Sequence, residues 1–202
     1  METPLLRTSD EGEHYVYLDL WYVVEQQLEH ADYQLRGSFY CYLIAMVFAF
    51  HALEAYLNYL GDGLAPHIGI KERKFFSKPP YRGFDGKVRK VLKLLGISEP
   101  NRECRPYRSV WELKKLRDTI AHPQRERISY SIDHPGSAPP EYRSIFENLV
   151  DREKAIQATD DVREFIKKLH AAAEPGMKHD EYFKEDPFDG ISRIISGNTI
   201  PI

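Results

Sequence analysis

Residues 50–61 read FHALEAYLNYLG, and their apolar side chains recur with the period of an α-helix. The stripe consists of Phe50, Leu53, Leu57 and Leu60, at i, i+3, i+7 and i+10. A continuous apolar stripe has to be covered by other elements of the fold. The pattern predicts a long helix that begins after a cap at Asp32, runs to Leu60 and stops at Gly61.

Helical patterns recur on both sides of this stretch, so we expect an all-α bundle of about five helices. The other predicted helices cover residues 15–30, 85–95, 106–122 and 151–173. Strict alternation from Ile128 to Ile132, and a return segment over 144–150, predict a small β-hairpin insertion near 128–150. Residues 1–176 are expected to form a single domain. The polar tail, 177–202, carries apolar residues at Ile191, Ile194 and Ile195 that are expected to dock on the body or on a partner.

Composition excludes several classes of protein. The chain has 202 residues and only two cysteines, Cys41 and Cys104, which form neither a CxxC pair nor a zinc-binding spacing. We therefore expect no metal and no cofactor, and a reducing, cytoplasmic setting. One run, 37–53, contains no Asp, Glu, Lys or Arg and approaches the length of a membrane span. Its polar residues favour a buried helix and no membrane partner.

Charge is distributed unevenly along the chain. Residues 1–62 hold two basic and ten acidic side chains, a net charge of −8, and residues 128–202 have a net charge of −5. Residues 63–127 hold 17 basic and seven acidic side chains, a net charge of +10. Such a basic block attracts a polyanion such as RNA. Pairing of basic helix faces with acidic neighbours inside the fold is an equally weighted alternative.

Residues 113–123, LKKLRDTIAHP, lie inside the basic block. The familiar phosphate-binding loops, the GxSxG elbow and the HExxH zinc motif are all absent, and ExxH at Glu11–His14 stands alone in a predicted loop. Arg117 and His122 are therefore the candidates for chemistry. A purely structural role for these two residues is the alternative, because cations near a helix C-terminus stabilise its exposed carbonyl groups.

The run LRDTIAHP, at the end of an amphipathic helix, resembles the Arg-x4–6-His motif of the HEPN superfamily, with Asp118 as the polar residue after the arginine. FHALEAYLNYLG looks like the second long helix of that family. GKVRKVLKLLGI and REKAIQATDDVREFIKKL fit the family's order of helices. The resemblance covers residues 15–173, apart from the 123–150 insertion. It implies a HEPN-like helical bundle, frequently a homodimer, and in many members a metal-independent RNase used as a toxin or in phage defence.

The resemblance implies a role for each residue of the motif. His122 would be the acid/base, Arg117 would stabilise the phosphorane, and Asp118, four residues before His122, would orient the imidazole. On a regular helix Arg117 points about 140° away from His122, so the two converge only if the helix loosens or across a dimer. The remaining candidates support the motif or bind RNA: Lys114, Lys115, Arg125 and Arg127 for the RNA backbone, and Glu54 and Asn58 on the second helix.

Two other interpretations remain open. In the first, a non-catalytic HEPN-like module binds a partner protein or a nucleotide, and Arg117 and His122 serve the structure. In the second, residues 37–53 anchor the protein in a membrane. The RNase interpretation also leaves room for an antitoxin or another partner protein.

Overall fold

The structure is a computed structural model that describes residues 6–33, 36–65, 76, 79–123, 125, 143–144, 146–178, 180, 183, 185–190 and 193–201. Within them lie five α-helices, which confirms the prediction of an all-α bundle. The helices are α1 (Val16–Tyr33), α2 (Ser38–Leu64), α3 (Gly83–Leu94), α4 (Tyr107–Ala121) and α5 (Arg152–Met177). A short 3₁₀ turn, η3, covers Glu147–Leu149, and two strands, β1 (Leu6–His14) and β2 (Arg193–Pro201), complete the elements.

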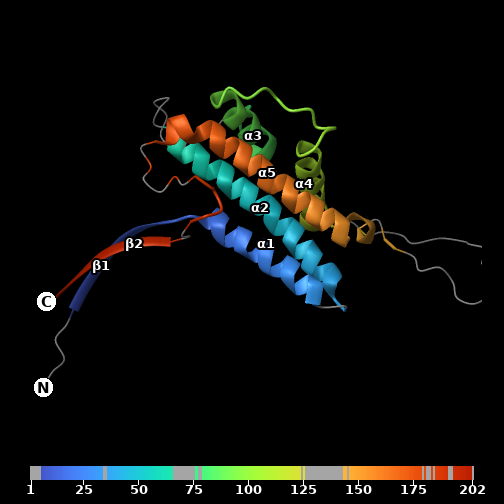
Figure 1. Ribbon diagram of the computed structural model, residues 1–202, viewed down its shortest axis with the longest axis horizontal. Coiled ribbons are helices and arrows are strands. Elements are labelled where there is room, and N and C mark those ends of the chain that lie inside the picture. Colours follow the sequence, from blue (N-terminus) through green and yellow to red (C-terminus); the bar gives the residue numbers. More distant parts are fainter. Residues whose placement is uncertain are drawn as a thin grey trace, which may run out of the picture.

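The helix α2 is the centre of the bundle. Figure 1 shows α1, α2 and α5 side by side with α2 in the middle, and α3 and α4 also pack against α2. The side chains of its apolar stripe, Phe50, Leu53, Leu57 and Leu60, are all 0% exposed. The stripe identified in the sequence is therefore the core of the molecule, and every other helix takes its position from it.

Both ends of α2 differ from the prediction. Asp32 belongs to α1, and the chain reverses at Gly37, whose φ of 90° is a left-handed conformation that suits glycine. The predicted stop at Gly61 is wrong, because α2 continues to Leu64. A Cβ at Gly63 would collide with the side chain of Met177 in α5. Gly63 therefore allows α2 and α5 to pack closely, inside the part of α2 that lies beyond the predicted stop.

The helix α5 likewise runs further than predicted. Its start is as expected, because Asp151 caps the helix and its side chain accepts a hydrogen bond from the backbone N–H of Lys154 at 2.8 Å. The predicted end near Ala173 is wrong, since the helix passes through Pro175 and ends at Met177. Met177 is fully buried against α2, and this packing holds the last turn in helical form.

The predicted return strand at 144–150 is replaced by η3. The backbone N–H of Glu147 donates to Ser144 Oγ at 3.0 Å, and the Glu147 carboxylate accepts from the N–H of Ser144 at 2.7 Å. This reciprocal pair is a capping box, which favours a helical turn. The backbone hydrogen bond from Ser144 holds the pKa of Glu147 below its usual value. The first strand of the predicted hairpin, 128–132, lies outside the described residues.

The two ends of the chain meet in a β-ribbon that the sequence analysis did not predict. β1 pairs antiparallel with β2, from Leu6 opposite Pro201 to His14 opposite Arg193, so the loop expected at 11–14 is instead a strand. The ribbon extends away from the helices (Figure 1). The preceding part of the tail packs on the body, where Phe188 contacts Trp21 at a ring-centroid distance of 4.6 Å and Phe183 stacks on His170 at 3.9 Å.

One helix among the described residues, α2, is long and apolar enough to cross a membrane by length and composition. Half of its most apolar window is buried inside the bundle. A core helix of a soluble protein meets the same criterion, so this feature carries little weight for a membrane anchor.

A glycine in α3 gives a test of the packing. A Cβ at Gly86 would collide with the backbone of Pro80 and Tyr81. Helix propensity alone favours alanine over glycine by about 0.5–1 kcal/mol. The structure predicts the opposite sign: Gly86→Ala should lower the free energy of unfolding by about 1–3 kcal/mol, because a backbone cannot move aside easily.

Chemical denaturation followed by circular dichroism measures this difference. Gly63→Ala is the control, because its Cβ meets the flexible end of Met177 and should cost less than Gly86→Ala. A Gly86→Ala protein as stable as the parent would contradict the packing of α3.

Candidate functional site

The motif lies at the C-terminal end of α4. Val110, Leu113 and Leu116 are buried and fix the orientation of the helix. His122 is the residue that caps α4, with φ −130° and ψ 61°, and its backbone N–H donates to the carbonyl of Asp118 at 3.0 Å. The helix thus ends directly before Pro123, as the sequence predicts. His122 is exposed and lies just beyond the last turn of the helix.

Arg117 lies on the core at the crossing of α4 and α2. Its guanidinium is placed over the ring of Phe50, 5.1 Å from the centroid, and Nη1 pairs with Oδ1 of Asp118 at 2.8 Å. Nη2 lies 4.0 Å from Oε2 of Glu54. Its Nε is buried and has no hydrogen-bond partner. The side chain is 30% exposed, so the guanidinium remains partly accessible from solvent.

Glu54 joins three helices. Its Oε1 accepts a hydrogen bond from Nζ of Lys87 in α3 at 3.0 Å, while its Oε2 faces Arg117 in α4. The expectation that Glu54 faces the motif helix agrees with this geometry. Asn58, one turn further along α2, is exposed. The two α2 candidates therefore differ in position, and Glu54 is the one that reaches the motif.

Asp118 has partners other than the one expected. One oxygen binds Arg117, and the other accepts from Nζ of Lys114 at 3.1 Å. Among the described residues, no contact joins the Asp118 carboxylate to the imidazole of His122. The contacts of Asp118 in this structure are thus with Arg117 and Lys114.

Six of the twelve basic residues of the block that the structure describes form ion pairs with other described residues. These pairs are Lys87–Glu54, Arg89–Glu99, Arg105–Asp161, Arg108–Glu112, Lys114–Asp118, Arg117–Asp118 and the longer Arg117–Glu54. Lys115 and Arg125 are exposed and make no ion pair with any described residue. Arg127 lies outside the described residues. Close to the motif, Lys115 and Arg125 therefore keep the most freedom to meet an anion.

The buried carboxylate of Asp161 anchors the start of α4 through an ion pair that the sequence analysis missed. Asp161 is 1% exposed and accepts from Arg105 Nε and Nη2 at 2.8–3.0 Å, and from the hydroxyl of Ser109. These hydrogen bonds raise the pKa of Arg105. The signal was present, because Asp161 stands on the apolar stripe of α5 beside Ala158 and Val162, where a carboxylate needs a partner.

Arg105 pairs with a buried carboxylate and Arg108 with an exposed one, so replacing each in turn compares the two ion pairs. Arg105→Ala leaves the Asp161 carboxylate buried beside Ser109 alone. The free energy of unfolding should fall by clearly more than in Arg108→Ala, because the buried carboxylate loses its charged partner. Arg108→Ala removes an exposed pair with Glu112 and should change it by at most about 0.5 kcal/mol.

Urea unfolding of the two variants beside the parent protein measures both values. Equal stabilities for Arg105→Ala and Arg108→Ala would show that Asp161 does not anchor α4.

The site combines an exposed imidazole, a partly exposed guanidinium and two exposed cations at one end of α4. Histidine transfers protons near neutral pH, and arginine binds phosphoryl oxygens through forked donors. Within the described residues there is no group of three or more His, Cys, Asp or Glu side chains that would hold a metal ion. No family model, no curated protein and no solved structure matches this chain.

Proposed function

We propose that this protein is a metal-independent endoribonuclease of the HEPN type. The observation that carries the proposal is the exposed His122 just beyond the end of α4, with Arg117 in the same helix and the exposed Lys115 and Arg125 within seven residues of it in the chain. Together they offer a proton-transfer group and positive charge to a phosphodiester. The resemblance of LRDTIAHP to the Arg-x4–6-His motif supports the same assignment.

The chemistry is an in-line transphosphorylation. The 2′-oxygen of a ribose forms a bond to phosphorus as its proton passes to a base, and the bond from phosphorus to the 5′-oxygen breaks as that oxygen gains a proton. His122 supplies the proton transfer, and Arg117 stabilises the charge on the phosphoryl oxygens. The products are a 2′,3′-cyclic phosphate and a 5′-hydroxyl.

A homodimer would bring two copies of the motif into one groove, so that one imidazole acts as base and the other as acid. Apolar side chains are exposed on α4, which carries the motif, and on α2. Ile120 of α4 is 39% exposed, and Tyr40 and Ile44 of α2 are 65% and 37% exposed. A second copy that covers them would remove apolar surface from water.

Arg117 must exchange a carboxylate for the phosphate when RNA binds. Its pairing with Asp118 orients the guanidinium along α4, and its buried Nε is a donor still without a partner. Asp118 is therefore assigned as the residue that positions Arg117. A cytoplasmic role as a toxin or in phage defence, with an antitoxin as partner, belongs to this proposal through the family resemblance alone.

The competing function is a non-catalytic module that binds a partner protein or a nucleotide. The contacts of Arg117 with Phe50, Glu54 and Asp118 favour it, because they tie the arginine into the fold. In that case Arg117→Ala would lower stability, and neither Arg117 nor His122 would affect RNA.

Incubation of the purified protein with mixed tRNA and single-stranded RNA in EDTA separates the two functions. The parent should produce 2′,3′-cyclic phosphate ends. His122→Ala should lower the cleavage rate by about 10²–10⁴-fold, because proton transfer is lost, and Arg117→Ala by about 10²–10³-fold. EDTA should leave the parent rate unchanged.

His30→Ala is the matched control, since His30 is an exposed histidine in the last turn of α1. It should cleave like the parent. If folded His122→Ala cleaves at the parent rate, the RNase proposal fails, and absence of cleavage by the parent protein favours the binding module.

A further inference from the structure

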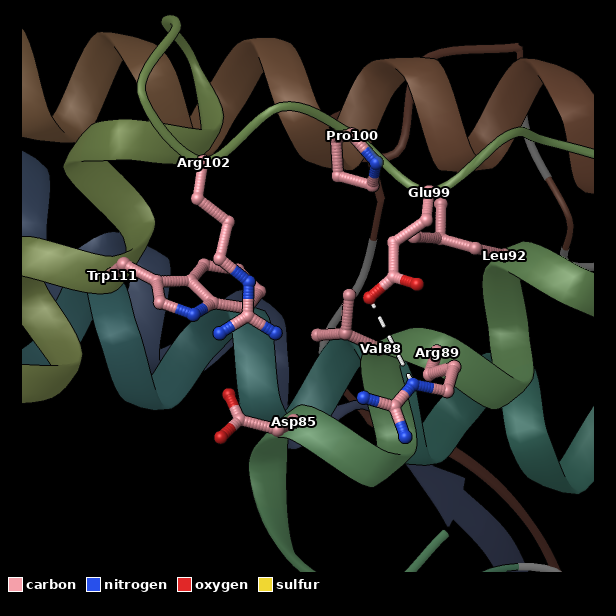
Figure 2. Close-up of a pocket in the computed structure, with 8 residues that line it drawn as sticks. All are labelled: Asp85, Val88, Arg89, Leu92, Glu99, Pro100, Arg102 and Trp111. Atoms are coloured by element: carbon pink, nitrogen blue, oxygen red, sulfur yellow. Dashed lines mark ion pairs between the residues drawn. The ribbon is translucent and has the colours of Figure 1, made fainter. Parts of the chain in front are cut away.

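The hollow between α3 and α4 is too small for an organic ligand. Its lining includes Asp85, Arg102 and Trp111 (Figure 2), and its volume of about 10 Å³ leaves room for about one water. The guanidinium of Arg102 already lies 4.3 Å from the centre of the Trp111 ring and covers it. A larger partner therefore has to bind elsewhere, on the surface of the molecule.

The β-ribbon of β1 and β2 stands away from the helical bundle (Figure 1). Each strand has nine residues, which gives a length of about 30 Å from a rise of about 3.4 Å per residue. Among the described residues no third strand pairs with the ribbon, and its only extensive packing is of one strand on the other. An isolated two-stranded ribbon is at best marginally stable in water, and open edges readily pair with another strand. The ribbon is therefore an interaction surface for a partner that supplies a strand.

The two open edges of the ribbon differ in charge. The strand β1, LRTSDEGEH, holds three acidic residues and one basic residue. The strand β2, RIISGNTIP, has Arg193 as its first residue and no charged residue from Ile194 to Ile200. Charged residues along an edge discourage pairing with another strand. The edge of β2 is therefore the one that accepts a further strand, and it contains Ile194 and Ile195, for which docking is expected from the sequence.

The residues of β2 suit antiparallel pairing of this strand with itself. If Gly197 lies on a two-fold axis, Ile194 comes opposite the partner's Ile200, and pairs of β-branched residues stabilise neighbouring strands. Arg193 comes opposite the partner's Pro201, so no like charges meet. We propose that β2 pairs with β2 of a second copy of the chain, so that the two ribbons form one four-stranded antiparallel sheet.

Other pairings of two ribbons are less favourable. Pairing of β1 with β1 about the corresponding axis places Asp10 opposite the partner's Asp10, and like charges directly opposite each other destabilise a sheet. Pairing of β1 with β2 of another copy leaves an open edge at each end, so the assembly continues as a fibre. Pairing of β2 with β2 closes the assembly and leaves the acidic strands at the outer edges, where charge protects them.

The proposed sheet keeps the two helical bundles apart. His14 and Arg193 form the end of the ribbon next to the bundle, because α1 begins at Val16. In an antiparallel pair this end lies beside the far end of the other ribbon, which consists of Leu6 and Pro201. The bundles therefore lie at opposite ends of a sheet about 30 Å long and do not compete for the edge. The interface contains no residue of α4, so this proposal does not rest on the proposed function.

Disulfide cross-linking tests the pairing directly. In full-length protein with Cys41→Ala and Cys104→Ala, Gly197→Cys supplies a single cysteine at the proposed axis. Directly opposite residues of antiparallel strands have Cα atoms about 4.5–5.5 Å apart, which is within the range of a disulfide. Mild air oxidation should therefore convert most of the protein into a covalent dimer, seen by electrophoresis without reductant.

Asp10→Cys in the same background is the matched control, because Asp10 is the partner of Gly197 within the ribbon. In the proposed sheet its counterpart in the second copy lies three strand spacings away, about 14 Å, which exceeds the reach of a disulfide. Asp10→Cys should therefore run as a monomer after the same oxidation. Equal cross-linking of the two variants, or none in Gly197→Cys, would overturn the proposal.

Gly197→Lys gives an independent measurement without cysteines. It places like charges opposite each other at the axis, whereas within its own ribbon the same position lies opposite the acidic Asp10. The mass measured by sedimentation equilibrium should fall to half that of the parent, with the helix content measured by circular dichroism unchanged. An unchanged mass, or a parent protein that is already monomeric, would contradict the pairing of β2 with β2. A parent protein that forms this dimer and does not cleave RNA would count against the proposed RNase alone.

Discussion

Burial of the apolar stripe of α2 is the constraint on which the rest of the structure depends. Four helices cover this one helix, and the residues that the stripe presents determine where each of them packs. Phe50 connects the core with the motif. Its ring is fully buried against Phe84 of α3, and the guanidinium of Arg117 lies over it. The position of the motif is thus a consequence of how the core packs.

Carboxylates on α5 and α2 pair with basic side chains at the start of α4 and near its end. Asp161 holds the start of the helix through Arg105 and Ser109, and Glu54 faces Arg117 near its end. Both carboxylates are paired because a carboxylate in or near the core is stable only with a partner. The net charge of the basic block therefore overstates the positive charge that is free to meet an anion, and exposed side chains such as Lys115 and Arg125 matter more than the total.

The candidate site at the end of α4 has rigid support. The packing of Val110, Leu113 and Leu116 against the core fixes the helix that leads to His122. Rigid elements position functional groups better than loops do.

The sequence by itself determined the helices, because apolar periodicity, the cap at Asp151 and the break before Pro123 act over a few residues. It also indicated Arg117, His122 and Glu54 as candidate site residues. Only the tertiary structure decided that α2 continues past Gly61 and α5 past Pro175, since the packing of Met177 against Gly63 outweighs the local signals. Tertiary contacts also determine the partners of Asp118 and Asp161 and the pairing of β1 with β2. Such contacts lie between distant residues, and no local pattern encodes them.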